Sequence, residues 1–279
     1  MIRLGGAIVD QGRSPESWLE MLKKYNYSAA VFPGSVNLGD PEVGEFIRLA
    51  EEHNICIAEI GAWSNPLSLD PEERRKALQH CIDKLALADE VGALCCVNIA
   101  GSFSDTWDGP DAKNFTQEAF DATVESVRKI IDAVKPKRTF YTLEPMPWMY
   151  PYSTETYLEL IRAVNRPQFA VHFDPVNMIT SPYMFYHNGE FLREFIRKLG
   201  PYIKSCHAKD IVLDSKLTVH LQEVRPGLGE LDYTTFLTEL AKLGTKVPLI
   251  IEHLDTEDDY EKATAYIRDV ARECGVKFV

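Results

Sequence analysis

The sequence predicts an α/β fold, a single (β/α)8 TIM barrel that forms one domain over residues 1–279. Eight short apolar runs alternate with longer segments of helical periodicity from one end of the chain to the other. No linker divides the chain, and 45% hydrophobic residues suffice for a large core. A barrel of this kind commonly needs about 250 residues, which the chain exceeds.

The eight apolar runs are the expected strands: residues 2–8, 29–32, 55–60, 94–99, 139–144, 169–174, 203–207 and 248–252. Ser14-Pro15-Glu16 and Asp70-Pro71-Glu72 each place a capping residue before a proline, a pattern that opens helices. Further helices are expected at 117–134, 153–164, 190–199, 233–243 and 257–274. Strict alternation favours parallel strands. An open doubly wound sheet would need a glycine turn after its first strand, but Gly5-Gly6-Ala7 lies within that strand.

Composition and charge exclude several partners. The formal charge of −12, without any run of basic residues, disfavours nucleic acid. No stretch approaches the roughly 20 apolar residues of a membrane span, and the first residues do not resemble a signal peptide, so we expect a cytoplasmic protein. The six cysteines lack metal-binding or redox spacing, which favours reduced, buried thiols. Assembly into a homo-oligomer stays open.

Four strand ends carry the residues that point to function. Leu143-Glu144-Pro145, Phe173-Asp174-Pro175, Cys206-His207-Ala208 and Ile251-Glu252-His253 each end an apolar run with an acid or an imidazole. Singly, each acid could be a helix cap or a surface ion pair, and the histidine a buried hydrogen-bonded residue. Together at equivalent ends, Glu144, Asp174, His207 and Glu252 predict ligands of one divalent metal ion. The oxygen-rich set favours Mn²⁺, with Mg²⁺, Co²⁺ or Zn²⁺ as alternatives.

Strand alternation predicts what lies beneath these ligands. Thr142, His172, Ser205 and Ile250 precede them by two residues and should face the barrel axis one layer deeper. Three of the four are polar, as suits residues that hold metal ligands in place. We expect His172 to support a ligand or to act as an auxiliary base. By the same alternation, His253 should point away from the axis as a structural residue.

The chemistry that such a site suits is proton abstraction next to a carbonyl. A cation bound to a carbonyl and a neighbouring hydroxyl acidifies the C–H between them, because the charge of the resulting enediolate falls on oxygens that the metal holds. Glu144 and Glu252 are the candidate acid and base. Lys209 could stabilise a developing alkoxide, or it could form an ion pair with Asp210.

Two long connections, 175–189 and 209–232, are expected to cover the active site. Aromatic and amide side chains at the barrel mouth suit a polyol, which offers C–H faces and hydroxyl groups. A small-molecule sugar or sugar derivative is therefore the expected partner. Its candidate contacts are Trp63, Asn65, Asn98, Trp148, Tyr150, Asn177, Glu223 and Arg225.

The order Glu in Leu-Glu-Pro, Asp in His-Phe-Asp-Pro, His in Cys-His-Ala-Lys-Asp and Glu in Ile-Glu-His resembles the xylose isomerase-like TIM barrels. This sugar phosphate isomerase/epimerase superfamily includes ketose 3-epimerases, hydroxypyruvate isomerase and inosose-processing enzymes, and the resemblance covers essentially the whole chain. It implies that the four residues bind one Mn²⁺-like ion and that the two glutamates serve as acid and base. The segment Pro226-Gly227-Leu228-Gly229-Glu230-Leu231-Asp232-Tyr233 also looks like this superfamily.

The chain departs from the ketose 3-epimerases that it resembles. At positions where they carry Glu, His and Arg, this sequence has Tyr150, Asn177 and Leu213. The expected function is therefore a metal-dependent keto-sugar isomerase or epimerase, and the alternative is a metal-dependent lyase or dehydratase of an oxidised 3-keto sugar or glycoside, as in C-glycoside deglycosylase subunits. An endonuclease IV-like hydrolase would need more histidines and a basic face. A non-catalytic sugar-binding barrel is the remaining alternative.

Overall fold

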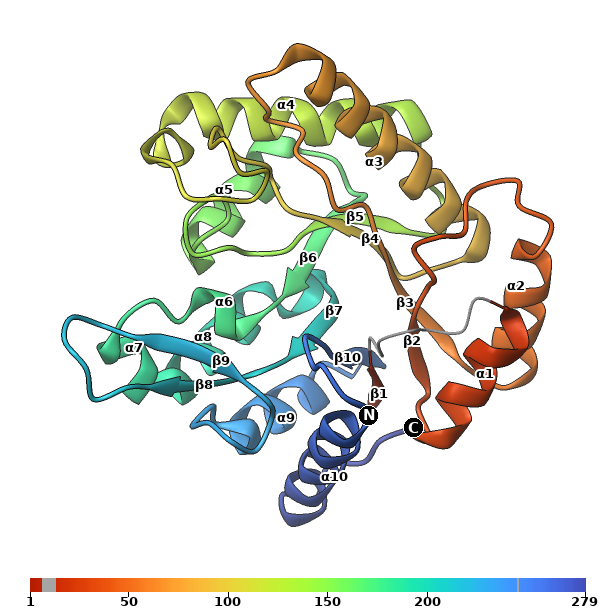
Figure 1. The fold of residues 1–279 in the computed structure, drawn as a ribbon, viewed down its shortest axis with the longest axis vertical. Helices are drawn as coiled ribbons and strands as arrows, with labels where there is room; N and C mark the ends of the chain where they lie inside the picture. Colours follow the sequence, from red (N-terminus) through yellow and green to blue (C-terminus); the bar gives the residue numbers. More distant parts are fainter. Residues whose placement is uncertain (7–13, 245) are drawn as a thin grey trace.

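The structure, a computed structural model, describes residues 1–6, 14–244 and 246–279. Eight parallel strands form one sheet in the order β1-β10-β7-β6-β5-β4-β3-β2, with helices around it (Figure 1). The prediction of a TIM barrel is confirmed. The strands are β1 (Ile2–Gly6), β2 (Ala29–Val31), β3 (Cys56–Gly61), β4 (Cys95–Asn98), β5 (Phe140–Leu143), β6 (Phe169–Phe173), β7 (Ile203–Ala208) and β10 (Val247–Ile251).

The first and last strands of this sheet order, β1 and β2, come together and nearly close the barrel. Ser28, directly before β2, donates its N–H to the Leu4 carbonyl at 3.0 Å. Gly5 permits this approach, because a Cβ there would overlap the Ala29 carbonyl. Residues 7 and 8, which we assigned to the first strand, lie outside the described residues.

The predicted caps open their helices. Ser14 accepts a hydrogen bond from the Ser17 N–H at the start of α1 (Pro15–Lys24), and Asp70 accepts from two amides at the start of α3 (Pro71–Val91). The other long helices are α2 (Val43–Glu52), α4 (Gln117–Val134), α5 (Thr154–Val164), α8 (Asn188–Leu199), α9 (Tyr233–Lys242) and α10 (Glu257–Glu273). Of these, α2 was not among the expected helices. Two short 3-10 helices are η1 (Ala112–Phe115) and η2 (Gly200–Tyr202).

Both long connections contain secondary structure that the sequence did not indicate. The connection after β6 holds two short helices, α6 (Pro175–Met178) and α7 (Pro182–Tyr186). The connection after β7 holds an antiparallel hairpin of β8 (Asp210–Leu213) and β9 (Leu221–Val224). Both follow carboxyl ends of barrel strands, at the end of the barrel where the candidate ligands lie.

The main apolar core lies between the barrel and its helices. Phe173 of β6 stacks on Phe195 of α8 with ring centroids 3.9 Å apart and meets Phe236 of α9 edge-on. The barrel interior is polar near the carboxyl ends of the strands. There Ser205 of β7 donates to Glu59 of β3 at 2.7 Å, although these strands are not neighbours in the sheet. Such a contact must cross the interior.

The six cysteines are free thiols, as expected, and four of them are fully buried: Cys81, Cys95, Cys96 and Cys206. Burial raises the pKa of the Cys206 thiol well above its ordinary value. Among the described helices, we find none with an apolar stretch of the length that a bilayer requires.

Candidate active site

The four predicted ligands meet at one point at the carboxyl end of the barrel. The Nδ1 atom of His207 lies 2.8 Å from Glu252 Oε1, 3.1 Å from Glu144 Oε1 and 3.6 Å from Asp174 Oδ2. One donor atom from each of the four residues lies within 4.8 Å of every other. All four side chains are at least nine-tenths buried. We refer to these four residues as the acid cluster.

The side chains of the acid cluster lie at the carboxyl ends of four barrel strands. Glu144 directly follows β5 and Glu252 directly follows β10, while His207 lies within the last residues of β7. Asp174 follows β6 and also caps α6, since its Oδ1 accepts hydrogen bonds from the amides of Val176 and Asn177. Its second oxygen, Oδ2, is thereby left to the cluster.

Lys209 closes the cluster from the loop side. Its Nζ lies 2.7 Å from Asp174 Oδ2 and 2.8 Å from Glu252 Oε1, and its side chain is 1% exposed. We had considered an ion pair between Lys209 and Asp210, but the structure pairs Lys209 with Asp174 and Glu252 instead. Burial lowers the pKa of Lys209, but the carboxylates of Asp174 and Glu252 outweigh burial and hold it well above its usual value.

Charged groups are the partners of two buried oxygens in the cluster, Asp174 Oδ2 and Glu252 Oε1. Lys209 Nζ lies 2.7 Å from the first and 2.8 Å from the second, although neither oxygen has a contact with hydrogen-bond geometry. The carboxylates of Glu144, Asp174 and Glu252 thus converge on one buried point together with His207. A divalent cation suits this point, because three carboxylate oxygens and one imidazole nitrogen form a donor set that Mn²⁺ and similar ions accept.

The protonation of the cluster is uneven. Burial raises the pKa of Glu144 above its usual value. For Glu252, burial opposes ionisation, but the positive charges of His207 and Lys209 prevail and hold the pKa at about 2. Burial also disfavours the charged form of His207, but the surrounding carboxylates, Glu252 first, keep its pKa well above the usual value. Without a cation, His207 is therefore an imidazolium among carboxylates.

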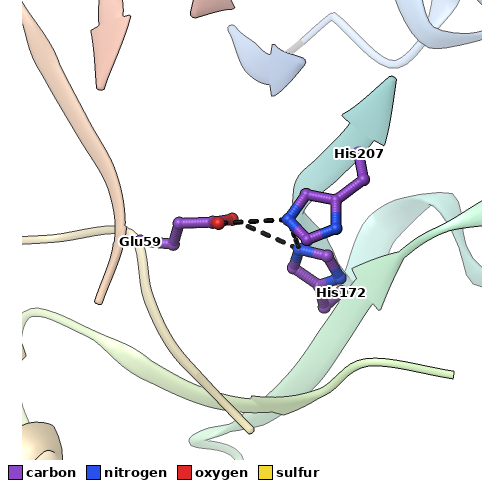
Figure 2. Close-up of side chains that lie close together, drawn as sticks. All are labelled: Glu59, His172 and His207. Carbon is purple, nitrogen blue, oxygen red and sulfur yellow. Dashed lines mark hydrogen bonds and ion pairs between the residues drawn. The ribbon is translucent and has the colours of Figure 1, made fainter. Parts of the chain in front are cut away.

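A second group of side chains supports His207 from below. Figure 2 shows Glu59 of β3 facing both imidazoles. Glu59 Oε1 lies 3.1 Å from His207 Nε2, and Glu59 Oε2 lies 3.2 Å from His172 Nε2. Ser205 is the third hydrogen-bond partner of the Glu59 carboxylate, so both of its oxygens have partners. Burial raises the pKa of Glu59, but His207 and His172 outweigh burial and hold it well below the usual range.

His172 thus supports a predicted ligand, which is one of the two roles that we expected. It is fully buried, and its Nδ1 has no hydrogen-bond partner. Its Nε2 lies 3.2 Å from Glu59 Oε2 and 3.1 Å from His207 Nε2. His172 is not among the residues that line the cavity above the cluster, and its role as an auxiliary base stays a prediction.

A cavity of about 490 Å³ opens over the acid cluster. This volume suits a small ligand. Of the predicted substrate contacts, it brings together Trp63, Asn177 and Glu223 with Glu144, Glu252 and Lys209. Asn177 donates its side-chain amide to Glu144 Oε1 at 3.2 Å, and Glu223 of β9 lies 3.4 Å from Lys209 Nζ.

Five other residues that we expected to contact substrate do not line this cavity. Each has another partner. The Asn65 side chain bonds Ser102 and Leu67, and Asn98 is fully buried against Cys81 and Ser64. Trp148 donates to the Asp108 carbonyl, Tyr150 packs on Phe120, and Arg225 pairs with Asp259.

His253 corrects a second expectation. Its backbone has φ of 56°, so the strand alternation that would turn it away from the axis has ended. The imidazole lies at the cavity, 3.0 Å from Glu223 Oε1 and 3.6 Å from Glu252 Oε1. The hydrogen bond that the imidazole donates to the Glu223 carboxylate raises the pKa of His253 above its usual value.

Two residues of the site escaped the sequence analysis. Glu59 carried a signal that could have found it, namely a lone acid inside the apolar strand Cys56–Gly61. Trp107 lines the cavity from a loop without periodicity, where no pattern marks it.

Comparison with known proteins agrees with the barrel fold. The family model described as "Xylose isomerase-like TIM barrel" matches residues 18–270. The chain belongs to this family. No significant match was found among curated proteins.

Solved structures of several other proteins have the same fold. D-Psicose 3-epimerase from Clostridium cellulolyticum H10, solved with D-tagatose, is 15% identical with a TM-score of 0.74 over 99% of this chain and 100% of that chain. The 3-keto-D-glucoside 4-epimerase YcjR from E. coli is 14% identical, with a TM-score of 0.70 over 96% and 100%. A protein from Mycobacterium smegmatis in complex with magnesium is 15% identical, with a TM-score of 0.67 over 98% and 97%.

Proposed function

We propose that this xylose isomerase-like barrel is a keto-sugar isomerase or epimerase that depends on one divalent cation. Glu144, Asp174, His207 and Glu252 would hold the cation, with Mn²⁺ as the first choice. The observation that carries the proposal is the convergence of three carboxylates and one imidazole, with one donor atom of each within 4.8 Å of every other, beside a cavity of about 490 Å³.

When bound, the cation would polarise a substrate carbonyl and acidify the adjacent C–H. The residues of the chain carry the proton. Glu144 and Glu252 follow strands on different sides of His207 and both line the cavity, so one can remove a proton from carbon and the other can return it. Asn177 holds Glu144 in place through its amide, and Lys209 offers a positive charge to an oxygen that becomes negative in the enediolate.

The magnesium-bound protein and the two epimerases support the proposal by their shared fold, the bound ion of the first and the reactions of the other two. The departures from the ketose 3-epimerase pattern have structural counterparts. Tyr150 lies in an aromatic cluster with Phe120 and Tyr152, and Leu213 ends β8 in the hairpin. Substrate recognition must therefore differ from that of the ketose 3-epimerases.

Incorporation of solvent deuterium tests the reaction. Incubation of the manganese-loaded protein with ketoses in D2O should place deuterium on the carbon next to the carbonyl, as read by mass spectrometry. Glu144→Gln and Glu252→Gln should each lower the exchange rate at least about 100-fold, since each removes a proton carrier. Glu194→Gln, at an exposed position of α8, is the matched control and should exchange at the wild-type rate. Full exchange in both cluster variants would refute the roles of Glu144 and Glu252.

The same experiment separates the proposed function from its rivals. A lyase would release a leaving group and form an unsaturated product that absorbs in the ultraviolet. A sugar-binding protein would show no exchange. A phosphodiesterase is disfavoured by the net charge of −12 and by the acidic side chains of the cavity, which repel phosphate.

A further inference from the structure

The cavity over the acid cluster adjoins a second one. That second cavity has a volume of about 610 Å³, and Trp63 and Trp107 line both. The two tryptophans are 43% and 44% exposed, which leaves large aromatic surfaces free. Aromatic faces with a polar edge suit the C–H face of a sugar ring. The pair therefore lies between two spaces, each of a size that accommodates one ring.

The chain fixes both tryptophans in place. Trp63 follows β3, and its indole lies over Gly61, where a Cβ would overlap the ring nitrogen. Trp107 lies in the connection after β4. That connection is held by Ser102, which donates to the Gly109 carbonyl at 2.7 Å, and by Trp148, which donates to the Asp108 carbonyl at 2.7 Å.

Asn65 and Asn114 complete the connection that carries Trp107. Asn65 accepts the Ser102 N–H at 2.9 Å and donates to the Ser102 carbonyl at 2.8 Å, and Asn114 accepts the Phe103 N–H at 2.9 Å. Asn65, which we expected at the substrate, thus holds this connection and also lines the second cavity, whereas Trp148 holds the connection through the Asp108 carbonyl.

Polar groups line the second cavity around the tryptophans. They include Ser68, His80 and Asp105, together with Glu73 and Lys76, which pair with each other at 2.9 Å. This lining matches the hydroxyl groups of a sugar better than an apolar group.

The charges around the two cavities indicate a neutral ligand. Among the described residues that line them, none is arginine, and each lysine is already paired with carboxylates. A phosphate group would lack a free cationic partner and would face Glu223 and Asp105.

We propose that the second cavity is a sugar subsite and that the substrate is a neutral, two-ring saccharide. Its keto-sugar ring would lie over the acid cluster, and its other ring would stack on Trp63 and Trp107. This inference rests on the proposed function and adds the class of substrate.

Calorimetry with four ligands tests the subsite on the manganese-loaded protein. D-Fructose supplies one keto-sugar ring, lactulose and palatinose supply the same ring with a second sugar attached, and fructose 6-phosphate supplies a charge. We expect lactulose or palatinose to bind at least about tenfold more tightly than fructose, and fructose 6-phosphate to bind no more tightly than fructose. Affinities of both disaccharides equal to or below that of fructose would overturn the proposal.

Variants that remove Trp107 or displace Trp63 sharpen the test. Trp107 lines both cavities, so Trp107→Ala is judged by the preference for a disaccharide: it should lower the disaccharide affinity at least about tenfold more than it lowers the fructose affinity. Gly61→Ala should act in the same direction, because the added methyl displaces Trp63 without removing an aromatic ring. Tyr202→Ala is the control, since it removes an aromatic ring of similar exposure, 41%, at the amino end of β7. An unchanged disaccharide preference in Trp107→Ala would contradict the subsite.

Failure of the subsite is distinguishable from failure of the proposed function. Deuterium exchange into fructose without any preference for a disaccharide would leave the function standing and remove the subsite. A preference that depends on Trp107, with no exchange into any of the ketoses, would leave the subsite standing and remove the function.

Discussion

At the scale of single residues, the candidate site depends on which nitrogen His207 presents to the acids. Its Nε2 faces Glu59 at 3.1 Å, and its Nδ1 faces Glu144 and Glu252. A carboxylate that accepts one ring proton fixes the tautomer and frees the other nitrogen for a cation. Glu59 is thus a positioning residue for the cation that we propose.

Replacement of Glu59 tests this role. Glu59→Gln keeps the size of the side chain but removes its charge, so the Nε2 proton of His207 is held less firmly. We expect the affinity for Mn²⁺ to fall about 10- to 100-fold, measured by competition with a fluorescent chelator. Glu125→Gln, an exposed glutamate on α4, should bind Mn²⁺ like the wild type. Unchanged affinity in a folded Glu59→Gln protein would show that Glu59 does not position His207.

The raised pKa of His207 gives cation binding a pH dependence. Below this pKa the ring is protonated, and a cation must displace the proton before it can use Nδ1. The affinity for Mn²⁺ should therefore rise with pH, by up to about tenfold per unit, until the pKa of the cation-free protein is passed. Calorimetry at pH 7 in buffers of different ionisation enthalpy should show about one proton released per cation. Binding without proton release would contradict a protonated His207.

Residue types alone predicted the acid cluster but not the surroundings. Glu144, Asp174, His207 and Glu252 were visible because each ends an apolar run. Asn65 and Trp148 could not be assigned in the same way, because an amide or an indole at a loop bonds equally well to backbone carbonyls or to a ligand. Only the folded structure shows which partner each side chain takes, because no local sequence pattern encodes it.

At the scale of elements, Asp210 organises the connection after β7. Its carboxylate accepts hydrogen bonds from the amides of Ile211, Gly227, Gly229 and Leu231 at 2.9 to 3.0 Å. Gly227 has φ of 93°, and a Cβ at Gly229 would overlap Asp210. The Pro226–Tyr233 pattern, which the sequence offered only as a resemblance, is therefore the segment that wraps this carboxylate.

Loss of the Asp210 side chain should destabilise the protein. Asp210→Ala leaves four amides without their acceptor in a buried place, and we expect the free energy of unfolding to fall by about 3 kcal/mol. Urea denaturation measures the change, with Asp258→Ala on the exterior of α10 as the control. A loss no larger than that of the control would show that solvent satisfies these amides.

The hairpin β8–β9 was missed for a physical reason. Each of its strands has four residues, which is too short for an alternating pattern to stand out. Its pairing brings Glu223 back to Lys209 and His253, so tertiary contacts rather than local sequence give this segment its place.

At the scale of the whole molecule, the alternation of strands and helices was enough to predict the barrel. Hydrophobic periodicity does not report the closure of β1 on β2, which depends on a backbone hydrogen bond between them. Nor does it report the polar interior around Glu59, which depends on a contact between β3 and β7, far apart in the sequence. The cytoplasmic location and the formation of homo-oligomers stay predictions.

Metal analysis of the whole protein tests the central claim most directly. Protein purified without chelators should carry one divalent cation per chain, and chelated protein should take up one Mn²⁺ with Asp174→Asn binding none. Elemental analysis and calorimetry give both numbers. Protein that arrives empty and binds no added cation would contradict the account, as would wild-type affinity in Asp174→Asn.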